Sequence, residues 1–388
     1  MGEWTIPVTP RVSAVRCAGD PRGAWVVGIV AKRTYEVRNG NLIEAEEQVP
    51  LVEEPIFGPQ ESVLLHDTDL LLNRTATDIV IQGHAYAHTG YPVFDAGVGV
   101  GSFARVIRVM GDRRVEWRPD RLRFTNPEPV EKIPLSWERA YGGIDQVARK
   151  TLGDPIEEEQ QKAGLPTDPR FGLFAYPRNP VGRGYLLQPT REAVETCQLP
   201  NLEDAAVPLT PASLPRHDFM RWPDGPPVAS LGWLSYAYFP RSAQIGIPPR
   251  PYRPDQIQPQ HFAEVRDGIL RSTSVRPEAT LEQRLDVGVA QSSAVGMRCA
   301  NAEWRASVQL LNLHPTAPKW AFSLPAHPPI VALKLEEKQP EQLHPAIRTI
   351  LIEPDLNRVC LVIVAERKTS VPLTPARTEA IQHAVVWK

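Results

Sequence analysis

The sequence predicts a mainly β protein of antiparallel sandwich- or barrel-like lobes, with ordered loops rich in proline and glycine and a short C-terminal helix. Three observations support this fold class. First, 41 of the 388 residues are proline, about twice the usual ~5% share, and proline disrupts helix interiors because it lacks an N–H donor. Second, runs of β-branched and aromatic residues recur along the chain. Third, several runs end at turn-forming pairs such as Asn39-Gly40 and Asn126-Pro127.

The N-terminal third contains the clearest strand patterns. We expect a hairpin in which residues 98–110 and 114–117 pair around a turn at 111–113. The other strands expected in this region cover residues 25–37, 78–87 and 122–124.

The C-terminal third returns to strand patterns after a middle region dense in glycine, proline and asparagine. A turn at residues 354–357 predicts a hairpin between the last two strands of this region. The expected strands cover residues 306–313, 320–324, 330–335, 349–353 and 359–365.

Only two segments have helical character. Residues 156–162 are acidic and predict a solvent-exposed loop helix. At the C-terminus, Thr374 suits an N-cap and Pro375 suits the first helical position. The apolar stripe of this expected C-terminal helix consists of Ile381, Ala384 and Val385.

The proline-rich middle suggests a division into two lobes. Prolines recur every few residues in 208–227 and 240–259, but aromatic residues accompany them. We therefore expect ordered loops packed on a sheet instead of flexible linkers. The division places an N-terminal β-rich lobe at residues 1–205, and the proline-rich connection with a C-terminal β-rich lobe at residues 206–388.

Composition narrows the classes of partner and compartment. The 43 Lys and Arg residues against 45 Asp and Glu residues give a net charge of −2, so we expect no nucleic-acid partner and no membrane insertion. The start of the chain lacks the pattern of a secretory signal, and no apolar run approaches 18 residues. The four cysteines form no C-x-x-C pair. The sequence therefore predicts a cytoplasmic protein with reduced thiols and no cofactor.

Motifs for catalysis or metal binding are weak. Residues 97–101 have the pattern Gly-Val-Gly-Val-Gly, but a strand pattern follows instead of the helix that a phosphate loop requires. His84 and His88 would lie ~13 Å apart on a strand, too far to share a metal ion, and His66 does not complete a known ligand motif. No G-x-S-x-G elbow is present. We expect no catalytic residue and no metal site.

Glycine, asparagine and aromatic residues concentrate in three short segments: 136–145, 179–185 and 199–203. Paired glycines permit tight turns and close approach of two backbones, and neighbouring rings can cover the bare backbone. The structural turn residues expected in these segments are Gly142, Gly143, Asn179, Pro180, Gly182, Gly184, Pro200 and Asn201.

Aromatic and arginine side chains on rigid turns also suit a protein-binding surface. The candidates for such a surface are Trp137, Arg139, Tyr141, Arg183 and Tyr185. From the residues alone, buried scaffolding is favoured over a binding surface, and both interpretations stay open.

An ordered series of segments resembles a family known as a domain of unknown function in Gram-negative bacteria. The most specific part of the resemblance is Tyr141-Gly142-Gly143 together with residues 179–185. The series begins at Asp69 and also contains residues 77–85, 109–113, 231–241 and 350–355. It covers most of the chain from about residue 20 to 367.

The resemblance implies a function in type VI secretion. Members of that family act as adaptors or chaperones that bind an effector, often through its N-terminal or PAAR-containing part, and load it on the trimeric spike. The resemblance carries no catalytic residue. Two alternatives stay open: an enzyme or carbohydrate-binding β protein whose site is assembled only in the fold, and a structural part of the secretion apparatus.

Overall fold

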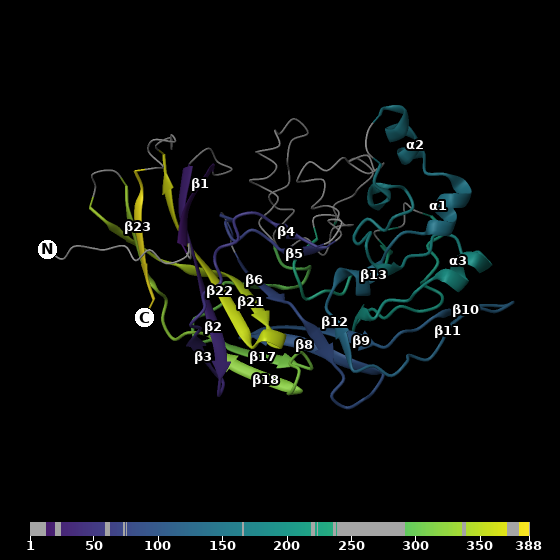
Figure 1. The fold of residues 1–388 in the computed structure, drawn as a ribbon, viewed down its shortest axis with the longest axis horizontal. Helices are drawn as coiled ribbons and strands as arrows, with labels where there is room; N and C mark the ends of the chain where they lie inside the picture. The colour runs from purple at the N-terminus through teal and green to yellow at the C-terminus, as the bar shows by residue number, and fades with distance from the viewer. Residues whose placement is uncertain are drawn as a thin grey trace.

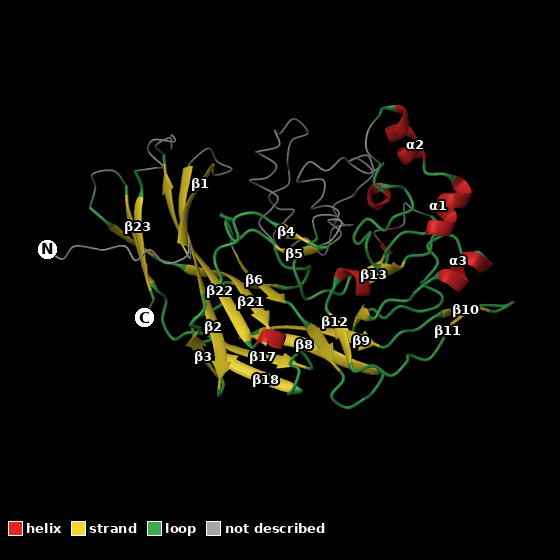
Figure 2. Cartoon of the chain, in the orientation of Figure 1, coloured by secondary structure: helices red, strands yellow, loops and turns green. Residues whose placement is uncertain are grey.

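The computed structural model describes residues 13–19, 25–58, 63–164, 167–235, 238, 292–335, 339–370 and 380–387, except 73, 75, 219–221 and 223. Strands hold 42% of the described residues and helices 11%, so the expected mainly β class is confirmed. Most strands belong to one large curled sheet that forms a half-barrel (Figures 1 and 2).

The large sheet joins strands from both ends of the chain. Within the described residues it contains twelve strands, in the order β15-β9-β8-β17-β18-β3-β2-β22-β21-β6-β16, with β1 beside β2. The sheet is mixed, because β18 with β3 and β21 with β6 are parallel pairs. Its strands are β1 (Ser13–Gly19), β2 (Trp25–Arg38), β3 (Asn41–Glu44), β6 (Ala76–Ile81), β8 (Val93–Val100), β9 (Phe103–Met110), β15 (Leu202–Asp204), β16 (Arg298–Ala300), β17 (Ser307–Leu311), β18 (Lys319–Ser323), β21 (Ala346–Glu353) and β22 (Arg358–Thr369).

The pairing of β2 with β22 forms the centre of this sheet. The two strands run antiparallel from Trp25 opposite Thr369 to Glu36 opposite Arg358. Both contain long runs of buried residues, as expected for strands covered on both faces. Two further pairs, β8 with β17 and β6 with β21, also join a strand from before the expected lobe boundary at residue 205 to a strand from after it. The two expected lobes therefore share a single sheet.

Small sheets and short helices surround the large sheet. In Figure 1 the three α-helices found among the described residues lie at one end of the molecule, and β1 and β23 lie at the other. The helices are α1 (Gln146–Leu152), α2 (Pro155–Lys162) and α3 (Arg191–Thr196). The small sheets pair β4 (Ile56–Phe57) with β5 (Leu64–His66), β7 (His84–Tyr86) with β12 (Lys132–Pro134), β10 (Val115–Trp117) with β11 (Leu122–Phe124), β13 (Tyr141–Gly142) with β14 (Arg183–Gly184), and β19 (Ile330–Lys334) with both β20 (Glu341–Leu343) and β23 (Gln382–Val386).

The prediction that residues 98–110 and 114–117 pair as a hairpin is wrong. The chain turns earlier, at Gly101, whose φ of 57° is left-handed, and β8 pairs with β9 so that Val100 lies opposite Phe103. Strand β10 instead pairs with β11. The expected strand at 78–87 is also interrupted, because Gly83 has a φ of 139° and separates β6 from β7.

The prediction of a C-terminal helix is wrong for the residues that the structure describes there. Residues 382–386 form β23, in which Val385 lies opposite Val331 of β19. Thr374 and Pro375, the expected cap and first turn, lie outside the described residues. Pairing with β19 provides this segment with backbone partners that its own sequence does not reveal.

The exposed loop helix at 156–162 is confirmed as α2, which buries none of its side chains. The first proline-rich segment packs as expected, because Leu209, Leu214 and Trp222 are buried in the main core. The second, residues 240–259, lies outside the described residues. No helix in the described ranges is long and apolar enough to cross a membrane.

Candidate protein-binding site

The three segments 136–145, 179–185 and 199–203, here called the loop cluster, come together beside β9 and β15. Strand β13 runs parallel to β14. The backbone N–H of Arg183 donates to Ala140 O over 3.0 Å, and that of Tyr185 donates to Gly142 O over 2.7 Å. The third segment is attached by Asn201, whose backbone N–H donates to Arg139 O over 2.8 Å. The segments thus form one hydrogen-bonded unit.

Two glycines allow this close packing. Gly142 and Gly143 have φ values of 148° and 99°, which L-residues with side chains rarely adopt. A Cβ atom on Gly143 would lie 2.5 Å from Gly182 O, and one on Gly142 would collide with Asn179 O. The prediction that these glycines permit tight turns and close backbone approach is confirmed.

Two buried asparagines fix the loops to their surroundings. The Asn179 side-chain amide donates to Trp137 O over 2.8 Å and to Tyr141 O over 3.1 Å. The Asn201 amide donates to Met110 O over 3.0 Å and to the Asp112 carboxylate over 2.8 Å. The other expected turn residues, Pro180, Gly182, Gly184 and Pro200, are at most partly exposed; Gly182 packs closely against Asn179, and Gly184 against Pro200.

The three aromatic candidates for a binding surface lie in the core. Trp137, Tyr141 and Tyr185 are 3%, 1% and 4% exposed. Both tyrosine rings contact Tyr176, at centroid distances of 5.0 and 5.3 Å, and the Trp137 indole donates to Trp233 O over 2.7 Å. These rings cover the bare backbone of the loop cluster, so the scaffolding interpretation applies to them and the expectation that they anchor a partner is corrected.

The two arginine candidates reach the surface and converge. Arg139 Nη1 lies 3.1 Å from Asn201 Oδ1, and Arg183 Nη1 lies 3.5 Å from the same oxygen. Arg183 Nε also donates to Glu138 O over 2.9 Å. Burial, and next the neighbouring Arg139 guanidinium, lower the pKa of Arg183 below its ordinary value. Only Asp112, 3.7 Å from Arg139, forms an ion pair with either side chain in the described part of the chain.

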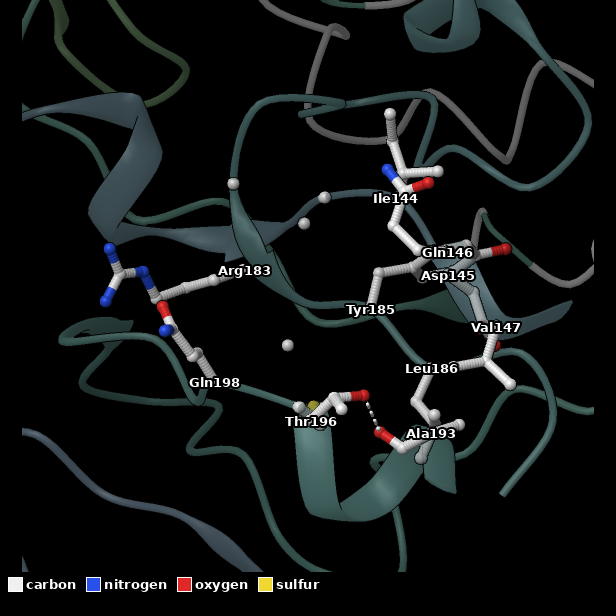
Figure 3. A pocket seen from close by; sticks show the side chains of 15 residues that line it. Ile144, Asp145, Gln146, Val147, Arg183, Tyr185, Leu186, Ala193, Thr196 and Gln198 are labelled. Atoms are coloured by element: carbon white, nitrogen blue, oxygen red, sulfur yellow. Dashed lines mark hydrogen bonds between the residues drawn. The ribbon is translucent and has the colours of Figure 1, made fainter. Parts of the chain in front are cut away.

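A pocket of about 260 Å³ opens beside Arg183. Figure 3 shows Arg183 and Gln198 on one side of the pocket, Thr196 and Ala193 of α3 below it, and residues 144–147 opposite. This volume is below the ~300–1,000 Å³ typical of small-molecule sites. It is large enough for one or two side chains of a partner.

The reactive groups in the pocket are already engaged or inactive. The Asp145 carboxylate accepts hydrogen bonds from the backbone N–H groups of Ala148, Leu187 and Gln188, at 2.9, 2.9 and 3.2 Å. Burial raises the pKa of the Cys197 thiol to about 12, so it is protonated near neutral pH and is a poor nucleophile. Neither Asp145 nor Cys197 is therefore an activated nucleophile.

The histidines considered for metal binding have other partners. His84 Nδ1 lies 2.6 Å from Asp355 Oδ2, and Tyr86 donates to the other oxygen of Asp355 over 2.8 Å. His88 contacts a backbone carbonyl, and His66 is packed against Trp233. In the described ranges, no three His, Cys, Asp or Glu residues are grouped to hold a metal ion. The glycines at 97–101 belong to β8 and its turn to β9.

Sequence reasoning missed two residues of this site. Asp112 supports Arg139 and Asn201, and Gln198 lines the pocket beside Arg183. Asp112 lies in the segment 109–113 that contributes to the family resemblance. That resemblance is the only sequence feature named above that could have pointed to Asp112. Gln198 has no distinguishing local pattern, because its position depends on the bridge that it forms with Arg114.

The fold and the site define a mainly β protein of half-barrel form, with two arginines that converge on Asn201 of the loop cluster, one of which, Arg183, lines a small pocket. The family described as "Uncharacterized protein conserved in bacteria (DUF2169)" matches residues 22–363. The chain belongs to this family, and the expected resemblance to a bacterial domain of unknown function is confirmed. No curated protein and no solved structure matches the chain.

Proposed function

We propose that this protein is a non-enzymatic, cytoplasmic adaptor that binds a type VI secretion effector and helps to load it on the trimeric spike. The effector's N-terminal or PAAR-containing part is the expected ligand. The observation that carries this proposal is the convergence of Arg139 and Arg183 on Asn201 beside a pocket of side-chain size.

The chemistry of the arginine pair supports protein recognition. A guanidinium group presents several N–H donors in a planar fork that matches a carboxylate. Asn201, which accepts hydrogen bonds from both arginines, is itself held in place by its side-chain amide and its backbone N–H. The two guanidinium groups therefore lose little conformational freedom when a partner docks. Arg139 is 31% exposed, which leaves part of its guanidinium accessible.

A paired measurement tests the site. The native partner is first recovered by co-purification from the host and identified by mass spectrometry. Arg139→Ala and Arg183→Ala are then compared with Arg191→Ala, an exposed arginine on nearby α3. We expect the first two variants to lose ~2 kcal/mol of binding, about thirtyfold in affinity, while all three keep the wild-type melting temperature.

Three other outcomes would contradict the proposed site or function. Unchanged affinity in folded Arg139→Ala and Arg183→Ala variants would reject this site. Export of the protein with the effector would favour the structural-component alternative, whereas turnover of a substrate by the purified chain would favour the enzyme alternative.

A further inference from the structure

The hairpin formed by β10 and β11, residues 114–125, projects at the end of the molecule that carries α3 (Figure 1). We call it the arginine hairpin. Its tip is closed by the backbone N–H of Arg118, which donates to Arg121 O over 3.0 Å, and its base by that of Thr125, which donates to Arg114 O over 3.0 Å. These bonds fix which side chains share a face.

One face of the arginine hairpin is apolar. Val115 lies opposite Phe124, and Trp117 lies opposite Leu122. Both members of the first pair and Leu122 pack against the main core. Further along the strands, Trp117 is 41% exposed and Leu122 is partly exposed. The apolar face therefore continues beyond the part of the protein that covers it.

The other face is strongly basic. Because side chains alternate along a strand, the same register places four exposed arginines there, together with Glu116. Arg118 is directly opposite Arg121, and like charges in such a position are destabilising. The arginines of this face are Arg114, Arg118, Arg121 and Arg123.

Local acidic residues compensate only part of this charge. Arg118 pairs with Glu116 at 2.7 Å, and Arg121 lies 3.9 Å from Asp120. The side chains of Arg114 and Arg123 have no ion-pair partner among the described residues. A chain with a net charge of −2 thus concentrates unpaired positive charge on one small element.

The outer edge of β11 is open. In this register the N–H and C=O groups of Arg123 point toward β10, while those of Leu122 and Phe124 point away from it. No described strand pairs with that edge of β11. An added strand would find backbone hydrogen-bonding groups there, with arginines on one side and apolar side chains on the other.

We propose that the arginine hairpin is a docking surface for an extended segment of a protein partner in which acidic and apolar residues alternate. The segment adds to the edge of β11, its carboxylates pair with Arg123 and Arg121, and its apolar side chains cover Leu122 and Trp117. Strand addition of this kind obtains affinity from backbone bonds and specificity from alternate side chains. The inference rests on the proposed function, because it gives the chemistry of the protein partner.

The position of the hairpin connects it to the site described above. Arg114, at its base, forms a β-bridge with Gln198, which lines the pocket beside Arg183. A single partner can therefore contact both. The open edge favours a peptide over nucleic acid or lipid, because neither of these can continue a β ladder.

The test uses a fluorescently labelled eight-residue peptide of alternating Glu and Val, with alternating Lys and Val as its control, measured by anisotropy at low salt on the full chain. Arg123→Glu removes the unpaired charge. Leu122→Pro removes an outward N–H without breaking a bond to β10, and Leu122→Ala controls for the lost side chain. Arg38→Glu, at an exposed arginine of β2, is the matched charge-reversal control.

We expect Arg123→Glu and Leu122→Pro to weaken binding of the acidic peptide at least tenfold, Leu122→Ala less, and Arg38→Glu not at all. The two charge reversals should keep the wild-type melting curve, and Leu122→Pro is compared with Leu122→Ala because Leu122 packs against the core. Absence of binding to the acidic peptide, or equal binding of the Lys-Val peptide, would overturn the inference. So would tighter binding to duplex DNA or anionic vesicles with the same dependence on Arg123. If Arg139→Ala weakens binding of the native partner but no hairpin variant does, the hairpin inference fails while the proposed function stands.

Discussion

The ammonium group of Lys32 donates a hydrogen bond to Asp69 Oδ2 over 2.9 Å, with the two side chains 0% and 1% exposed. The same carboxylate oxygen accepts the backbone N–H of Val52 over 2.8 Å. This pair therefore attaches the segment between β3 and β6, which includes β4 and β5, to the central strand β2.

Removal of one member of this pair should be strongly destabilising. We expect Asp69→Ala to lower the free energy of unfolding by ~3–5 kcal/mol, because it leaves a buried ammonium group without its counter-charge. The double variant Lys32→Met/Asp69→Ala should lose clearly less than the sum of the two single variants. Urea unfolding of the four proteins checks this, and additive losses would show that the two groups do not stabilise each other.

Gly143→Ala should cost more stability than substitution of an unpacked glycine that also has a positive φ. Gly90 has a φ of 69° and nothing within 4 Å of a Cβ atom, so Gly90→Ala should cost only the ~1–2 kcal/mol of the left-handed conformation. At Gly143 the contact with Gly182 O adds overpacking of ~1–3 kcal/mol. Equal melting temperatures for the two variants would mean that the loop cluster yields to the added methyl group.

Two buried tyrosines that contact each other should respond differently to loss of the hydroxyl group. The Tyr141 hydroxyl has no hydrogen-bond partner among the described atoms, and burial raises its pKa well above the usual value. The Tyr176 hydroxyl donates to Pro226 O over 3.0 Å. We expect Tyr141→Phe to be neutral or stabilising and Tyr176→Phe to cost ~1–3 kcal/mol, measured by thermal unfolding. The reverse order would contradict this assignment.

Protonation of His66 should contribute to loss of stability in acid. Its pKa is lowered, first by burial, with Lys32 acting in the same direction and Asp69 opposing. Its ring nitrogens lie near the Lys32 ammonium and the Asp67 carbonyl, an arrangement that suits a neutral ring. Because the folded pKa is below the unfolded value of ~6.5, the contribution is complete above pH ~6.5 and is lost as pH falls from there toward the folded pKa.

His66→Gln should therefore show a shallower fall in the free energy of unfolding between pH 7.5 and pH 5.5 than the wild type. Some pH dependence should remain, because burial also lowers the pKa of His314 and His383. His344→Gln, at an exposed histidine, is the control for the same substitution outside the core. Identical slopes for His66→Gln and the wild type would show that protonation of His66 does not contribute to the loss of stability in acid.

Local chemistry was enough to predict several features from the sequence. The left-handed residues Asn39 and Gly40 close the turn between β2 and β3 as their residue types indicate. Gly142 and Gly143 adopt positive φ values for the same reason, since few other residues do so without cost. The exposed helix α2 follows from its polar composition and the Asp154 cap. Each of these features depends on a few consecutive residues.

Strand partners, burial and the arginine site were decided by the tertiary structure. Residues 382–386 became a strand because β19 offers an edge about 50 residues away in sequence. Strand β10 paired with β11 because the chain had already turned at Gly101. Trp137 is buried while Arg139, two residues later, reaches the surface and meets Arg183 from a segment 44 positions away. Residue type sets local backbone preference, but pairing and burial are set by long-range contacts whose free energy no short segment contains.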